Sequence, residues 1–98
     1  MTAEKVMAAA AAWFDSGEFK TTLARRVAIH SESQRDDRDE EIRRYLNEEI
    51  TPAMNAMGFT LTELANPAAP LRPMLLATRI EDPALPTVLC YGHGDVVF

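Results

Sequence analysis

The 98-residue chain has the length of one small domain, and 47% of its residues are hydrophobic, which is enough for a modest core. Its formal net charge is −5 and no basic face emerges, so we expect no nucleic-acid partner. The single cysteine, Cys90, excludes an intrachain disulfide and favours a reducing, cytoplasmic compartment. No stretch reaches the ~18 apolar residues of a membrane span, so we expect no membrane partner either.

Two helices are predicted at the start of the chain. Thr2 can cap the first one, and residues 15–17 break it before a second helix over residues 18–29. Arg25 and Arg26 of the second helix are predicted to face water. The apolar stripes of the two helices follow helical spacing and comprise Val6, Ala9, Ala10, Trp13, Phe19, Leu23 and Val27.

A third helix is predicted in the charged middle of the chain. Residues 32–49 carry charges of both signs, which is typical of an exposed helix with ion pairs three and four residues apart. Asp36 or Asp37 is predicted to cap this helix, Pro52 to kink or split it, and Gly58 to end it as a left-handed cap. Its predicted buried stripe comprises Ile42, Leu46, Ile50, Met54 and Met57.

Three strands are predicted in the last part of the chain, over residues 59–64, 74–80 and 87–91. Residues 66–73 hold three prolines and must form a loop. The turn at 81–86 is short, so the second and third strands are predicted to be antiparallel neighbours. Helices followed by strands predict an α/β fold with a mixed sheet.

The residues with the clearest chemistry follow the third predicted strand, where Gly92 turns it into a loop. His93 and Asp95 are two residues apart, and such side chains of an extended segment point to the same side. Groups at the carboxyl ends of strands often bind ligands in α/β sheets. A neutral imidazole is a good zinc ligand, and a nearby carboxylate can fix its tautomer. The spacing alone is compatible with part of a metal site or with an ordinary polar turn.

This segment also resembles the first metal motif of a family of zinc-dependent peptidases and amidohydrolases, an apolar strand followed by Gly-His-x-Asp-Val-Val. The family includes acetylornithine deacetylase, succinyl-diaminopimelate desuccinylase, aminoacylase, glutamate carboxypeptidase and carnosinase-like dipeptidases. By position, the resemblance makes His93 a zinc ligand and Asp95 the catalytic-site carboxylate that orients it. The matching residues are Val88-Leu89-Cys90-Tyr91-Gly92-His93-Gly94-Asp95-Val96-Val97.

The resemblance implies an activity, a fold and an assembly. The family hydrolyses amide bonds of small peptides or N-acyl amino acids with a water that two zinc ions activate, cobalt or manganese being alternatives. Its catalytic domain is an α/β/α sandwich, and a separate smaller domain forms a homodimer. Residues 1–98 would be the N-terminal portion of that catalytic domain, with three helices and then three strands, truncated after the first metal motif. The other ligands and the glutamate base come later in the family, so we expect the isolated chain to be inactive.

Two further interpretations stay open. The chain could be a non-enzymatic α/β interaction module, whose open apolar sheet edges bury themselves in a partner. It could also be a catalytically inactive family member that acts as a scaffold. Under all of these interpretations, we expect Cys90 on the third strand to be a small buried hydrophobe, and His30 to be a surface residue at a helix end.

Overall fold

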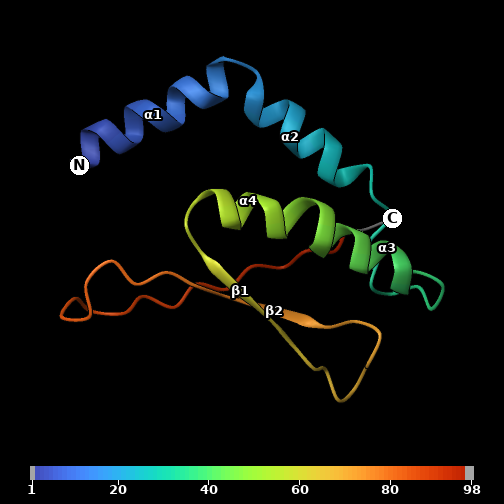
Figure 1. Cartoon of the computed structure of the whole chain (residues 1–98). Coiled ribbons are helices and arrows are strands. Elements are labelled where there is room, and N and C mark those ends of the chain that lie inside the picture. Colours follow the sequence, from blue (N-terminus) through green and yellow to red (C-terminus); the bar gives the residue numbers. More distant parts are fainter. Residues whose placement is uncertain (1, 97–98) are drawn as a thin grey trace.

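The computed structural model describes residues 2–96, which form helices followed by a two-stranded sheet, a mixed α/β arrangement (Figure 1). None of the described helices has the length and apolar content that crossing a membrane requires. The helices are α1 (Ala3–Asp15), α2 (Glu18–Val27), α3 (Asp39–Arg44), the π-helix η1 (Tyr45–Ile50) and α4 (Thr51–Ala56), and the strands are β1 (Thr60–Leu64) and β2 (Met74–Thr78).

Helices α1 and α2 form a corner at the start of the chain. The predicted cap of α1 is confirmed, because the Thr2 hydroxyl accepts a hydrogen bond from the Lys5 backbone N–H at 3.2 Å. At the corner, the Phe19 ring of α2 lies 5.2 Å from the Trp13 ring, edge to face, and 5.8 Å from the Phe14 ring. These aromatic contacts set the direction in which α2 leaves α1.

Helical turns continue from α3 through η1 into α4. Pro52 is near the start of α4 and has no backbone N–H to donate to the preceding turn. The wider turns of η1 lie directly before this point, and π-helical turns accompany interruptions of the α-helical hydrogen-bond pattern. The predicted split at Pro52 is therefore absent, since helical turns continue through it, and only the change from π-helical to α-helical turns marks the place.

The end of α4 is also as predicted. Gly58 has a φ of 84°, in the left-handed region where a side chain is strained. The Gly58 N–H donates to the Asn55 carbonyl at 3.0 Å, and the Phe59 N–H donates to the Met54 carbonyl at 3.1 Å. This pair of bonds is the Schellman motif, and it turns the chain directly into β1.

The start of α3 differs from the prediction. The helix begins at Asp39, after Arg38, and neither Asp36 nor Asp37 caps it. The Asp37 carboxylate instead accepts a hydrogen bond from Arg35 Nε at 3.3 Å. The segment before α3 is held by Arg72, which donates to the Ser33 and Arg35 carbonyls and to the Asp39 carboxylate at 2.5 Å.

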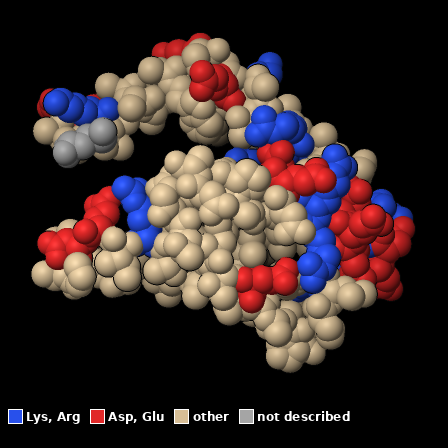
Figure 2. Space-filling view, in the orientation of Figure 1, with Lys and Arg blue, Asp and Glu red and all other residues tan. Residues whose placement is uncertain are grey.

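The predicted stripe of the third helical segment is only partly buried. Ile42, Leu46, Ile50 and Met54 are half-buried, whereas Met57 is 52% exposed and the prediction for it is wrong. Figure 2 shows that charged side chains gather at the α3 end of the molecule, while mainly uncharged residues cover the middle of this face.

Strands β1 and β2 pair antiparallel, with Thr60 opposite Thr78 and Leu64 opposite Met74. Helix α4 packs on β1 (Figure 1), and one face of the sheet is half-buried through Leu61, Leu75 and Ala77. The opposite face leaves its apolar side chains in solvent. Its exposed members are Leu64, Met74 and Leu76.

The third predicted strand is absent from the described residues 87–91, which have no regular structure. Val88, Leu89 and Tyr91 are 82%, 88% and 87% exposed, so this segment lies against neither strand of the sheet. A strand needs a neighbour for its backbone hydrogen bonds, and no such neighbour is present here. The predicted pairing of the second and third strands is therefore wrong, since β1 and β2 pair instead. Cys90 is exposed, which contradicts its predicted burial.

An ion-pair cluster joins α2 to η1. The prediction that the arginines of α2 face water holds for Arg25, whose side chain is 58% exposed, and is wrong for Arg26, whose side chain is 31% exposed. Glu49 of η1 is only 8% exposed, and Arg25 Nε donates to both of its carboxylate oxygens, at 2.8 and 3.0 Å. Arg26 Nε lies 3.4 Å from the same carboxylate. The hydrogen bond from Arg25, and then the charges of both arginines, lower the pKa of Glu49.

Replacing Glu49 by Gln should flatten the acid dependence of stability. Because the folded-state pKa of Glu49 is lowered, its charge stabilises the fold fully above the ordinary value of 4.5 and ceases to do so as the pH falls through the lower value. We expect the free energy of urea unfolding to fall more steeply below about pH 4.5 in the wild type than in Glu49→Gln. Glu48→Gln, which removes an exposed partner of Arg44, is the matched control and should keep the wild-type slope. Equal slopes for Glu49→Gln and the wild type would contradict this role.

Candidate functional site

The structure brings His93 and Asp95 together. The distance between His93 Nδ1 and Asp95 Oδ1 is 2.5 Å, so the ring N–H faces the carboxylate. The His93 side chain is 63% exposed, whereas the Asp95 side chain is 14% exposed. The pair thus consists of an imidazole at the surface and a carboxylate behind it, and it lies on an irregular segment instead of at the end of a strand.

A turn that follows α2 holds this segment in place. The Ser33 hydroxyl donates to Asp95 Oδ2, and Gln34 Nε2 lies 3.4 Å from the same oxygen. The Ser31 hydroxyl donates to the Gly94 carbonyl at 3.1 Å. The Ser33 hydrogen bond, and then the charge of His93, lower the pKa of Asp95. Asp95 is therefore a carboxylate with both oxygens in use, one by the imidazole and one by the turn.

The same turn is the most buried part of the described chain. Ser31 is 1% exposed and Glu32 is 6% exposed, next to Ile29 at 3%. Glu32 accepts a hydrogen bond from Arg38 Nε at 3.0 Å, and its own backbone N–H is the main cause of a lowered Glu32 pKa. The prediction of Glu32 as part of an exposed helix is wrong, because these donors satisfy its charge inside the structure. The side chain of His30 is 67% exposed, as predicted for a surface residue.

Gly94 lies against an aromatic ring. A Cβ at this position would be 2.6 Å from Cε1 of Tyr45, the first residue of η1. Real Cβ atoms do not approach carbon atoms so closely, and Tyr45 is held in a helix, so only glycine fits without a shift. The glycine between His93 and Asp95 thus allows the segment to lie on η1.

A cavity of about 240 Å³ adjoins the His93–Asp95 pair. Helix α2 lines it with Leu23, Arg26 and Val27, and η1 adds the Tyr45 ring. The segment from His93 to Val96 forms the remaining wall. The cavity therefore combines a surface imidazole with apolar walls and one arginine.

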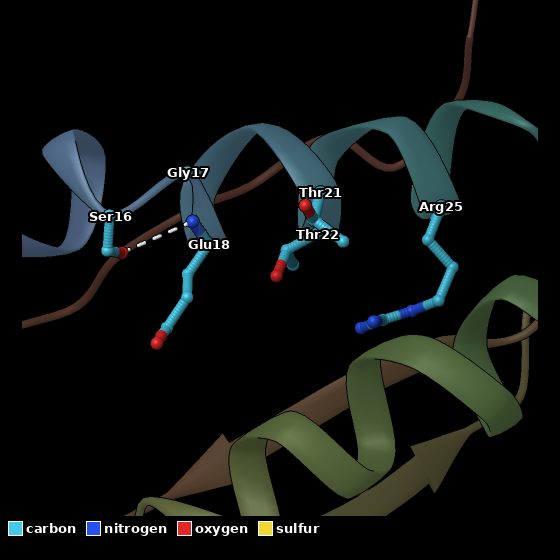
Figure 3. Close-up of a pocket in the computed structure, with 6 residues that line it drawn as sticks. All are labelled: Ser16, Gly17, Glu18, Thr21, Thr22 and Arg25. Carbon is cyan, nitrogen blue, oxygen red and sulfur yellow. Dashed lines mark hydrogen bonds between the residues drawn. The ribbon is translucent and has the colours of Figure 1, made fainter.

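A larger and more open hollow of about 360 Å³ lies elsewhere, at the α1–α2 corner (Figure 3). Its lining is mostly polar, and the Ser16 hydroxyl there accepts a hydrogen bond from the Glu18 backbone N–H at 3.3 Å. It contains neither His93 nor Asp95, so we assign the candidate site to the smaller cavity. The residues of this hollow are Ser16, Gly17, Glu18, Thr21, Thr22 and Arg25.

The donor atoms of this pair fit one ligand position of a metal site. Because His93 Nδ1 faces Asp95, Nε2 is the ring nitrogen available to a metal, and the exposed ring leaves it accessible. Asp95 is placed to orient the ring, since its oxygens are already bound. Among residues 2–96, no three His, Cys, Asp or Glu side chains gather to hold an ion. The described chain thus offers one oriented imidazole, whereas catalytic zinc usually has three protein ligands.

Sequence reasoning found the pair itself but missed the residues that hold it. The Ser-rich turn was visible as a helix end, yet nothing in the spacing of Ser31 and Ser33 indicates a partner more than 60 residues later. No protein-family model, curated protein or solved structure matches this chain. What the site does is therefore inferred from its contacts and from the resemblance of its motif.

Substituting Gly94 by Ala should destabilise the chain, because the new Cβ would overlap the Tyr45 ring. Overpacking of this kind typically costs about 1–3 kcal/mol in the free energy of unfolding. Urea denaturation measures the difference. Gly92→Ala is the matched control, since a Cβ at Gly92 has no atom within 4 Å and should leave stability nearly unchanged. An equal loss in the two variants would show that the Tyr45 contact is not the cause.

Proposed function

We propose that this chain forms part of a zinc-dependent hydrolase that cleaves amide bonds of small peptides or N-acyl amino acids. The observation that carries the proposal is the 2.5 Å contact between His93 Nδ1 and Asp95 Oδ1, with the imidazole exposed and the carboxylate behind it. The same two residues are those that the motif resemblance names as ligand and orienting carboxylate. Cobalt or manganese could replace zinc at such a ligand.

The roles of the two residues follow from their hydrogen bonds. Asp95 Oδ1 accepts from the Nδ1–H of His93, which keeps the lone pair on Nε2 for a cation. Asp95 Oδ2 is occupied by Ser33, so Asp95 serves better to hold the ring than to bind metal. A bound zinc would polarise the substrate carbonyl and lower the pKa of a water toward neutrality. The apolar walls from Leu23 and Val27 suit an aliphatic acyl group or side chain beside the imidazole.

The same proposal includes an α/β/α sandwich, whose completion would cover the apolar segment 87–91, which has no regular structure here. Two observations support it: the exposed apolar side chains of this segment, and the uncovered apolar face of β1 and β2 opposite α4. A sandwich covers both faces of its sheet with helices, and buried strands are rich in such side chains. The resemblance further supports a homodimer, and the single cysteine a cytoplasmic location.

The isolated chain should bind zinc weakly and hydrolyse nothing, because one imidazole cannot replace three or four ligands. Calorimetric titration of the 98-residue chain with zinc checks this expectation. His93→Ala should remove most of the residual heat, and His30→Ala should remove little of it. A submicromolar site in the wild-type chain would contradict the proposed single-ligand role.

In the enzyme that carries this segment, His93→Ala should abolish metal-dependent hydrolysis of N-acetyl amino acids and dipeptides. Asp95→Asn should lower kcat strongly, because the neutral amide lacks the negative charge that holds the His93 ring through Nδ1–H. His30→Ala, at the other histidine, is the matched control and should keep wild-type rates. Retained activity in His93→Ala, or no hydrolysis of either substrate class by the wild type, would refute the assignment.

A second candidate is a non-enzymatic interaction module. The observation that favours it is the exposed apolar side chains of Ile80, Leu85 and Val88, at 72%, 57% and 82%. The reading frame beyond the codon of Phe98 separates the two candidates. Continuation to a Glu-Glu pair favours the hydrolase, whereas a stop codon favours the module or a defective remnant of the family. A catalytically inactive relative would keep the frame and fail the hydrolysis assay.

A further inference from the structure

We propose that Ser33 and Arg72 are positioning residues for His93, acting through Asp95. Arg72 fixes the turn that carries Ser33, Ser33 holds one oxygen of Asp95, and the other oxygen of Asp95 fixes the tautomer of the His93 ring. The use of that tautomer in metal binding rests on the proposed function. The positioning itself depends only on residues of this chain, so it can be measured without any metal.

Arg72 is suited to this task by its three acceptors. Its Nε lies 2.5 Å from Asp39 Oδ1, its Nη1 donates to the Ser33 carbonyl at 2.5 Å, and its Nη2 donates to the Arg35 carbonyl. The side chain is 19% exposed. A guanidinium offers five N–H donors in a rigid plane, so one side chain can bind both carbonyls and the start of α3 together. A lysine ammonium is a single point of charge and cannot span the same three acceptors.

Ser33 connects the anchored turn to the site. Its hydroxyl donates to Asp95 Oδ2, while the more distant Gln34 amide lies 3.4 Å from the same oxygen. With Oδ2 anchored, the carboxylate cannot rotate freely, and Oδ1 stays directed at His93 Nδ1. The hydrogen bond made by one ring nitrogen decides which nitrogen carries the proton. The neutral ring of His93 should therefore be protonated mainly at Nδ1, whereas free neutral histidine favours Nε2–H.

The test is the tautomer of His93 in the chain labelled with ¹⁵N-histidine. The ¹⁵N shifts of both ring nitrogens are read by NMR at about pH 8.5, well above the ordinary histidine pKa. The wild type should show mainly the Nδ1–H form at His93. Ser33→Ala and Arg72→Lys should shift it toward the ratio of free histidine, and Ser33→Thr, which keeps the hydroxyl, should restore it.

The controls separate positioning from general destabilisation. His30 gives a second reading in the same spectrum. Its Nδ1 lies 3.5 Å from Glu32 Oε1 in the same turn, so unchanged His30 shifts in Ser33→Ala verify that the turn itself is intact. Arg43→Lys alters another arginine whose ion pair, with Glu63 at 3.1 Å, lies away from the site, and should leave the His93 shifts unchanged. Unchanged amide shifts in β1 and β2 verify that each variant is folded.

Two outcomes would overturn the proposal. One is a wild-type His93 with the tautomer ratio of free histidine. The other is a Ser33→Ala variant with wild-type shifts. Failure of the hydrolase proposal would leave these shifts unaffected, because no metal or substrate is present in the measurement. Loss of zinc-dependent activity in His93→Ala together with unchanged tautomers in Ser33→Ala would retain the hydrolase and reject the positioning role.

Discussion

The hydrogen bonds between the turn after α2 and the segment that carries His93 determine the geometry of the candidate site. Ser31 and Ser33 bind Gly94 and Asp95 across more than 60 residues of chain. Ser31 and the neighbouring Glu32 are among the most buried side chains of the described residues. Buried polar groups need specific partners, so this turn accepts few alternative arrangements. An apolar contact of the same size would bring the segments together without fixing the direction of any side chain.

Much of the helical part could be predicted because its signals are local. The Thr2 cap and the left-handed Gly58 depend on residues within one or two helical turns, and both appear in the structure as expected. The segment before α3 is different, because its Ser33 and Arg35 carbonyls are bound by Arg72, which lies more than 30 residues later and has no local signal. Residues 87–91 illustrate the same limit for strands. Their β-branched and aromatic side chains favour a strand, but that preference is realised only against a neighbouring strand.

The candidate site also combines a local signal with contacts that the sequence does not reveal. The spacing of His93 and Asp95 is a local signal, and the two side chains do meet. The residues that hold Asp95 are separated from it by 61 and 62 positions, and a serine or glutamine on a turn has many possible partners. The Gly94–Tyr45 contact is equally hidden, since a glycine between two polar residues is compatible with any tight turn. The sequence could therefore indicate the His93–Asp95 pair but not the structure that orients it.

The division between an exposed imidazole and a held carboxylate has a chemical consequence. A carboxylate that faced solvent would compete with the imidazole for a cation, and it would bind calcium or magnesium as readily as softer metals. Because Ser33 and His93 occupy both oxygens of Asp95, the nitrogen of His93 is the donor that the pair presents. Nitrogen donors favour zinc and its transition-metal neighbours over the hard cations. Under the proposed function, the contacts of Asp95 would thus affect the choice of metal as well as the orientation of the ring.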